Sequence, residues 1–187
     1  SFDGVDDNVL FNGLNGVYSN FSFVTKVKLN SNNQFQSLFY LGEEFSGNNT
    51  TGSIDLTIDN INYNPAQLQV SLNFNHGVVG TQSYNLNTWI DIAGVFDGVN
   101  QILSLYIDGL LVGSVSTSVS SITFLNNYVH KIGIGYSSST QSLANFFNGN
   151  ISHLALFSGT ILTSQEIQQY VLCPPVGNET NLVAYYN

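Results

Sequence analysis

The acidic side chains are the first residues to consider for chemistry, because the 187-residue chain has 12 Asp and Glu residues against three Lys. Hydrolysis of a glycosidic bond needs two carboxyl groups about 5–9 Å apart across one groove. Glu43 and Glu44 are adjacent, so they would point to opposite faces of a strand. Asp55 and Asp59 would share a strand face but lie about 13 Å apart. The sequence therefore predicts no sugar-cleaving site, and we expect that the protein is not an enzyme.

The motifs of other catalytic and metal sites are missing from the sequence. There is no G-x-S-x-G motif for a serine nucleophile. His76, His130 and His153 are scattered without H-x-x-x-H spacing, so no zinc motif is present. Cys173 is the only cysteine, which excludes a disulfide framework within the chain.

One group of acids has the chemistry of a calcium site, because calcium takes oxygen ligands from carboxylates, amides and main-chain carbonyls. The segment FDGVDDN brings Asp3, Asp6, Asp7 and Asn8 together around a glycine that permits a tight bend. The sequence predicts a calcium ion held by Asp3, Asp6 and Asp7. The alternative is a solvated turn that leads into the next strand, since the EF-hand spacing is missing.

Amide and carboxylate side chains form a second candidate site, because they hydrogen-bond sugar hydroxyls without cleaving the glycan. The segments SIDLTID and QLQVSLNFN both alternate, and their polar residues would lie on one outward face if the two strands are neighbours. The carbohydrate-binding residues predicted there are Asp55, Asp59, Asn73 and Asn75. The alternative is an ordinary hydrated sheet face.

An aromatic ring would complete such a site, since sugar rings rest on aromatic faces. Tyr106 should point away from its neighbours Leu105 and Ile107, and it is the predicted stacking platform. Trp89 stands at the start of a strand, and we expect it in the core or at the edge of the core.

The elements that must position these residues are strands. Alternation of apolar and polar residues with period two marks residues 21–29, 53–59 and 67–75 as strands with one buried face. The segment LYIDGLLVG predicts a hairpin, because an Asp-Gly pair suits a two-residue turn that needs positive φ at both positions. One helix is expected after Thr163, which forms a capping box with Glu166.

The charge of the chain limits its partners. The formal net charge is −9, and the cations are Lys26, Lys28 and Lys131. Nucleic-acid affinity comes mainly from cations, so we expect no nucleic-acid partner. No apolar run approaches the roughly 18 residues of a membrane span, so no membrane insertion is expected. A surface hydrated by Asn, Ser, Thr and Gly suits a secreted, cell-surface or virion setting.

The hairpin segment WIDIAGVFDGVNQILSLYIDGLLVG resembles the W-x-H-V-A…D-G…L-Y-V-D-G-x-L-V signature of the laminin-G-like, concanavalin A-like jelly-roll family. SFDGVDDNVLF resembles the family's first strand, and residues 132–167 resemble its late G…F-x-G-x-I-D-x-V-x-I-Y…L-S-x-x-E-I segment. NLVAYYN is similar to the L-V-A-Y-W strand at the boundary of such domains. The chain departs from the family in two places: Asp91 replaces the His of W-x-H-V, and Ser152 and His153 replace the acidic pair after G-x-I.

The resemblance implies an all-β fold, an antiparallel jelly-roll β-sandwich with one short helix near the C-terminus. It covers nearly the whole chain, so we expect residues 1–187 to form one laminin-G-like domain of a larger protein. Most members of the family bind carbohydrate or protein without catalysis, often with a calcium ion. The implied function is therefore a glycan- or glycoprotein-binding or adhesion module. The alternative is a structural unit that associates with neighbouring copies in a surface filament, viral fibre or capsid decoration.

Overall fold

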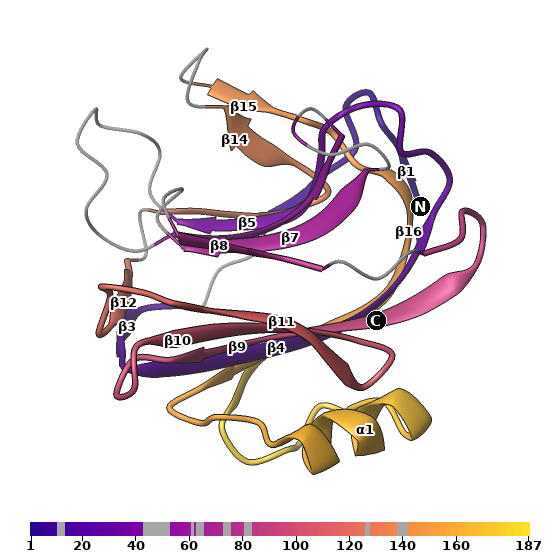
Figure 1. Cartoon of the computed structure of the whole chain (residues 1–187). Helices are drawn as coiled ribbons and strands as arrows, with labels where there is room; N and C mark the ends of the chain where they lie inside the picture. Colours follow the sequence, from indigo (N-terminus) through magenta and orange to yellow (C-terminus); the bar gives the residue numbers. More distant parts are fainter. Residues whose placement is uncertain are drawn as a thin grey trace.

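Two antiparallel sheets lie face to face in the computed structural model, and a helix lies outside the first of them (Figure 1). The described residues are 1–10, 14–42, 53–60, 62, 66–72, 76–80, 84–125, 128–137 and 142–187. Strands with alternating apolar residues bury one face each, so two sheets of this kind enclose a core between them. The predicted antiparallel jelly-roll sandwich with one short helix is confirmed.

The first sheet combines strands from both ends of the chain. Its order is β1 (Phe2–Asp3), β16 (Asn148–Ser158), β4 (Asn20–Leu29), β9 (Trp89–Asp97), β10 (Ile102–Ile107) and β11 (Leu110–Ser116), with β17 (Leu182–Tyr186) also paired to β16. The β10–β11 hairpin turns at Asp108 and Gly109, which have φ of 49° and 76°. The predicted Asp-Gly hairpin is therefore confirmed.

The second sheet lies above the first in Figure 1. Its order is β2 (Val9–Leu10), β13 (Val129–Ile132), β5 (Gln36–Gly42), β6 (Ile54–Asp59), β7 (Gln67–Leu72) and β8 (His76–Val79). Two smaller pairs are formed by β3 (Gly16–Tyr18) with β12 (Ile122–Phe124), and by β14 (Gly135–Ser137) with β15 (Ser142–Ala144). The β14–β15 hairpin lies over the side of the second sheet that faces away from the first (Figure 1).

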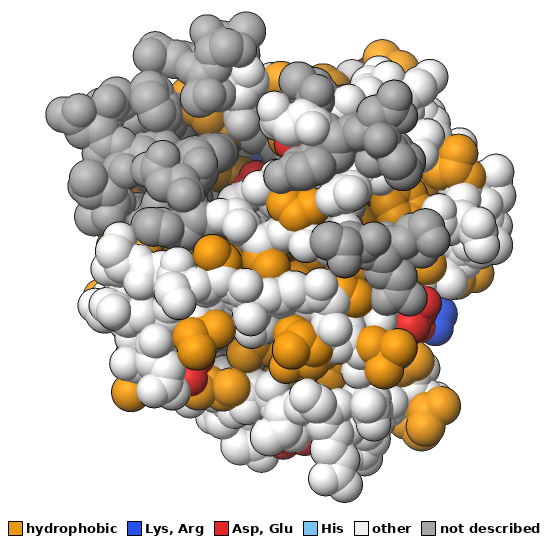
Figure 2. All heavy atoms as spheres, viewed as in Figure 1, with side chains coloured by type: hydrophobic (Ala, Val, Ile, Leu, Met, Phe, Trp, Pro, Cys, Tyr) orange, Lys and Arg blue, Asp and Glu red, His pale blue; other side chains and the backbone are white. Residues whose placement is uncertain are grey.

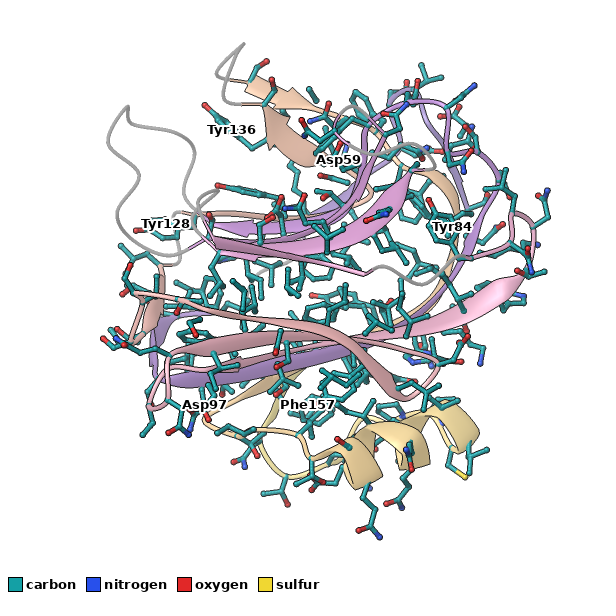
Figure 3. All side chains as sticks on the ribbon, viewed as in Figure 1. Asp59, Tyr84, Asp97, Tyr128, Tyr136 and Phe157 are labelled. Atoms are coloured by element: carbon teal, nitrogen blue, oxygen red, sulfur yellow. The ribbon has the colours of Figure 1, made fainter. Side chains whose placement is uncertain are left out.

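The core has two parts. The larger part fills the space between the sheets, where the rings of Phe23 and Phe39 meet edge to face with their centroids 4.9 Å apart. The smaller part lies between the first sheet and the helix α1 (Ser164–Leu172), where Phe157 stacks on Tyr170 (Figure 3). The first sheet is therefore covered by apolar contacts on both faces near α1.

The helix begins as the sequence predicts. The Thr163 side chain accepts a hydrogen bond from the Glu166 backbone N–H, and the Glu166 carboxylate accepts one from the Thr163 backbone N–H. This reciprocal capping box satisfies two N–H groups that a helix start leaves unpaired. None of the described helices is long and apolar enough to cross a membrane.

Candidate functional site

A row of polar side chains crosses the outer face of the second sheet. Lys131, Tyr40, Asp55, Ser71 and Gly77 lie directly opposite one another on five consecutive strands, from β13 to β8. Neighbouring strands are about 4.8 Å apart, so the row brings together residues that are far apart in the sequence. The condition for the predicted site, that the strands of Asp55 and Ser71 are neighbours, is met.

Two further rows continue this polar face toward the other end of β6. Thr57 lies opposite Gln69, and its hydroxyl donates to the Gln69 backbone carbonyl at 3.5 Å. Asp59 accepts hydrogen bonds from the Asn62 backbone N–H at 2.9 Å and side-chain amide at 2.7 Å. The residues that we call the polar face are Tyr40, Asp55, Thr57, Asp59, Gln69 and Ser71.

The polar face is more buried than the sequence predicts. Asp55, Thr57 and Asp59 were expected to be solvated, yet their exposed fractions are 7%, 1% and 2%. Part of the cover is the β14–β15 hairpin, because Tyr136 of β14 stacks on Tyr40 with ring centroids 5.9 Å apart. Figure 3 shows Tyr136 and Asp59 on the same side of the second sheet, away from the first sheet.

Burial has a large electrostatic effect on Asp55. Loss of solvent raises the pKa of its carboxyl from 3.8 to about 7, although a hydrogen bond from the Ser71 side chain opposes the shift. Its Oδ1 atom is buried and has no hydrogen-bond partner among the described residues. A buried acceptor without a hydrogen bond destabilises the folded protein. A ligand that donates a hydrogen bond to this oxygen would therefore lower the free energy of the complex.

The face opens toward β7 and β8. Gln67, Gln69 and Gly77 are only half-buried there. A side chain on Gly77 would collide with the Gln69 amide, so glycine leaves room for that amide beside Ser71. The amide offers both a donor and an acceptor next to the Asp55 row.

The structure does not bring all the predicted binding residues together. Tyr106 points away from Leu105 and Ile107, as predicted, but on the outer face of the first sheet, where α1 covers it. Its exposed fraction is 9%, and its hydroxyl accepts a hydrogen bond of 3.5 Å from Ser164. Tyr106 is therefore separated from Asp55 and is not an open platform. Asn73 and Asn75 lie outside the described residues.

The N-terminal acids form a turn with internal hydrogen bonds. The Asp7 carboxylate accepts from the Asp3 backbone N–H at 3.0 Å, and the Asp3 carboxylate accepts from the Val5 backbone N–H at 2.8 Å. The backbone carbonyl of Asp6 accepts a hydrogen bond from the side-chain amide of Asn8. The described residues contain no group of three His, Cys, Asp or Glu side chains that could hold a metal ion. Calcium at Asp3, Asp6 and Asp7 therefore stays a prediction.

Sequence reasoning missed a second polar surface, on the outer face of the first sheet. His153, Lys26 and Asp91 lie in one row across β16, β4 and β9, and Lys28 and Trp89 form the next row. We call these five residues the outer strip. Trp89 was expected in or at the edge of the core, but 45% of it is exposed. The alternation of apolar and polar residues in β4 and β9 was the available signal, since it predicts an outward-facing set.

The charges of the outer strip are arranged in pairs. Lys26 Nζ lies 2.8 Å from Asp91 Oδ2, and Lys28 Nζ lies 5.5 Å from the centroid of the Trp89 ring. His153 is 4% exposed, and burial lowers the pKa of its imidazole, with Asp91 opposing and Lys26 adding to that shift. A neutral imidazole offers one donor and one acceptor.

The family of the chain follows from comparison with known proteins. The model of the Laminin_G_3 family, described as the concanavalin A-like lectin/glucanases superfamily, matches residues 3–168. The chain therefore belongs to this family, as the sequence signature predicts. The family description includes both lectins and enzymes. A comparison with curated protein sequences found no match.

Solved structures with the same fold include a pentraxin and sugar-binding modules. The heptameric SAP-like pentraxin of Limulus polyphemus has a TM-score of 0.74 and 14% identity, over 100% of this chain and 89% of the pentraxin. A Bacteroides ovatus protein assigned as carbohydrate-binding has a TM-score of 0.77 and 14% identity, over 100% of this chain and 50% of that one. The CBM40 module of the Ruminococcus gnavus IT-sialidase, bound to α2,3-sialyllactose, has a TM-score of 0.59 and 16% identity, over 89% and 97%. At these identities the similarity establishes the fold.

Proposed function

We propose that the protein is a non-catalytic carbohydrate-binding module of an extracellular or cell-surface protein. Its family includes lectins, and a module of similar fold is bound to a sialylated sugar. The observation that carries the proposal is the Asp55 carboxylate, whose Oδ1 lacks a partner among the described residues of the polar face. A sugar hydroxyl is a donor that such an oxygen can accept.

The surroundings of Asp55 suit a hydroxyl-rich ligand. Ser71 and Tyr40 flank it in the same row, and Gln69 offers a donor and an acceptor one row away. Sugar sites combine a few such polar groups with aromatic side chains, and here the buried rings of Tyr40 and Tyr136 stack on each other beside Asp55. A glycan would approach from the half-buried side at β7 and β8 and donate a hydroxyl to Asp55.

The same geometry argues against catalysis. Asp59 is the other described acid of the polar face, and it lies four residues from Asp55 on the same strand. That spacing corresponds to about 13 Å, beyond the 5–9.5 Å range of paired glycosidase carboxyls. Both carboxylate oxygens of Asp59 also accept hydrogen bonds from Asn62, so they are already engaged and are poorly placed to act as a general acid or base.

A glycan array followed by affinity measurement tests the proposal. Asp55→Asn keeps the size of the side chain but replaces one acceptor oxygen by an amide donor. We expect it to weaken binding of the best array glycan about tenfold, because a hydrogen bond to a charged or polar acceptor contributes about 1.5 kcal/mol.

Asp97→Asn is the matched control, since Asp97 ends β9 on the first sheet and accepts hydrogen bonds from Asn100. It should bind glycans like the unmodified protein. Circular dichroism should show that both variants are folded. Unchanged affinity in folded Asp55→Asn protein would remove the polar face from the model, and the absence of any array ligand would reject the function itself.

A further inference from the structure

The outer strip gathers residue types that are rare in this chain. It holds two of the three lysines and the only tryptophan of a protein with net charge −9. Figure 2 shows one face of the molecule, where charged side chains are sparse among hydrophobic and uncharged polar ones. The outer strip therefore brings two lysines and the tryptophan together on one face of the first sheet.

The five side chains of the outer strip point to one side of the sheet. Lys26 lies between His153 and Asp91, and Lys28 lies opposite Trp89. Rows two residues apart on one strand face are separated by about 7 Å, which is close to the width of one pyranose ring and its substituents. A single sugar residue can therefore contact both rows.

The two rows offer the two kinds of contact that a sugar needs. Trp89 is 45% exposed with Lys28 Nζ over its ring, so a sugar would stack on the part of the indole that Lys28 leaves open, and such aromatic surfaces contribute strongly to recognition. Asp91 accepts hydrogen bonds and Lys26 donates them, and both side chains remain partly exposed. Asp91 and Lys26 neutralise each other, and the remaining charge of the strip, Lys28, lies over the Trp89 ring, so the Asp91–Lys26 pair itself suits a neutral polyhydroxylated ring.

A small hollow of about 10 Å³, the space of about one water-sized group, lies beside the strip between the first sheet and α1. Asp91 and His153 line it together with apolar Ala93, Ile167 and Val171. His153 is 4% exposed, so its ring can be reached only by a group that enters the hollow.

We propose that the outer strip is a second saccharide site, in which a neutral pyranose stacks on Trp89 and hydrogen-bonds Asp91, Lys26 and His153. The site lies on the opposite sheet from Asp55, so it goes beyond the function proposed for the polar face. It would remain if the polar face bound nothing.

Tryptophan fluorescence tests this proposal directly, because Trp89 is the only tryptophan. The intact protein is titrated with methyl β-glucoside, methyl β-galactoside and N-acetylglucosamine. We expect a saturable change in emission with at least one of them, little affected by ionic strength because the ligand is uncharged. No saturable change with any of the three, or a steep loss of binding with salt, would overturn the proposal.

Variants locate the ligand. Asp91→Asn should weaken the fluorescence response about tenfold, as expected for the loss of a charged acceptor. Trp89→Ala should weaken calorimetric binding of the same sugar, and Trp89→Phe should restore much of it, since a stacking ring is retained. Equal binding by Trp89→Ala would overturn the site.

Asp55→Asn is the control that separates the two sites. It should leave the Trp89 titration unchanged even where it abolishes glycan retention by the polar face. A Trp89 response that Asp55→Asn removes would reject a second site. A Trp89 response that persists in a protein whose polar face binds nothing would support the outer strip alone.

Discussion

Asp91 and His153 lie on the same face of the first sheet, one on each side of Lys26. These two residues stand at the positions where the chain departs from its family signature. The chain resembles that signature with an acid, Asp91, in place of a histidine, and with Ser152 and His153 in the segment after G-x-I. Both departures therefore lie beside Lys26 on the outer face of the first sheet.

The pKa of His153 should report on this row. Asp91 raises it and Lys26 lowers it, while burial has the largest effect and lowers it. We expect Asp91→Asn to lower the His153 pKa further and Lys26→Met to raise it, as measured by NMR titration of the imidazole protons. The pKa of His130, on the other sheet, should stay constant and is the internal control. Shifts of the opposite sign would contradict the electrostatic arrangement.

The pH dependence of stability should depend on Asp55. The pKa of its carboxyl is about 7 in the folded protein, against 3.8 for an unperturbed aspartate as in the unfolded chain. The folded state therefore binds the proton more tightly than the unfolded state does. The free energy of unfolding therefore decreases as pH rises from about 4 to about 7, by up to about 4 kcal/mol from this group. Asp55→Asn should remove that decrease in urea unfolding at several pH values.

The contribution of Asp55 to the pH dependence of stability must be separated from the contributions of other titrating groups. His130 and His153 have pKa values lowered by burial, so their contribution to stability decreases as pH falls below about 6.5, opposite in sign to that of Asp55. The informative quantity is thus the difference between variant and unmodified protein. Asp97→Asn should change the profile only at acidic pH, because hydrogen bonds from Asn100 lower the pKa of Asp97.

Gly94 should tolerate no side chain. A Cβ atom there would lie 2.6 Å from Cζ of Phe23, in the core between the sheets. Overpacking of this kind costs about 1–3 kcal/mol, so Gly94→Ala should lower the unfolding midpoint by several degrees in calorimetry. Gly159→Ala is the comparison, because its Cβ would meet nothing within 4 Å and only its φ of 69° opposes the change. A smaller effect at Gly94 than at Gly159 would contradict the packing.

The helix cap should contribute measurably to stability. Thr163→Ala removes the hydroxyl that accepts from the Glu166 backbone N–H at 3.2 Å. Loss of an N-cap costs about 1 kcal/mol, which denaturant unfolding detects. The pKa of Glu166, lowered chiefly by the Thr163 backbone N–H and also by its hydroxyl, should rise toward its usual value. Thr180→Ala, at an exposed position, should leave both quantities unchanged.

Calcium binding is tested by thermal unfolding with added calcium and then with a chelator. An ion bound only by the folded protein raises the midpoint through mass action. If Asp3, Asp6 and Asp7 hold calcium, the midpoint rises with the ion and Asp7→Asn removes the increase. An unchanged midpoint would leave Asp3 and Asp7 as acceptors for the N–H groups of their own turn.

The hairpin turn and the helix start could be predicted because each is determined by a few residues that are adjacent in the sequence. The Asp108-Gly109 turn needs positive φ at two adjacent residues, and the capping box joins Thr163 to a residue three positions later. The outward direction of Asp55 follows from alternation within one strand. Each of these properties depends on short-range sterics or hydrogen bonds, which a short segment determines.

The burial of the site residues depends on contacts between segments that are distant in the sequence. The alternation of residues within one strand does not predict such contacts. Asp55 is buried although it faces outward, and a hairpin more than 80 residues later contributes cover through the stacking of Tyr136 on Tyr40. Tyr106 is covered by the helix that starts at Ser164. Trp89 is 45% exposed, whereas Ala93 and Val95 of the same strand belong to the core between the first sheet and α1.

The arrangement of β1 and β17 along β16 determines how the fold would respond to pulling. β1 pairs with the start of β16 through Phe2 and Asp3, whereas β17 pairs over Leu182–Tyr186 with the C-terminal part of the same strand. Tension applied between residues 1 and 187 would therefore act on β16 at two places, where β1 and where β17 pair with it. The shorter pairing would separate first, and β16 would still be held by β4 over nearly its whole length. Under mechanical load, the N-terminal segment and its acidic turn would detach before the sandwich itself opens.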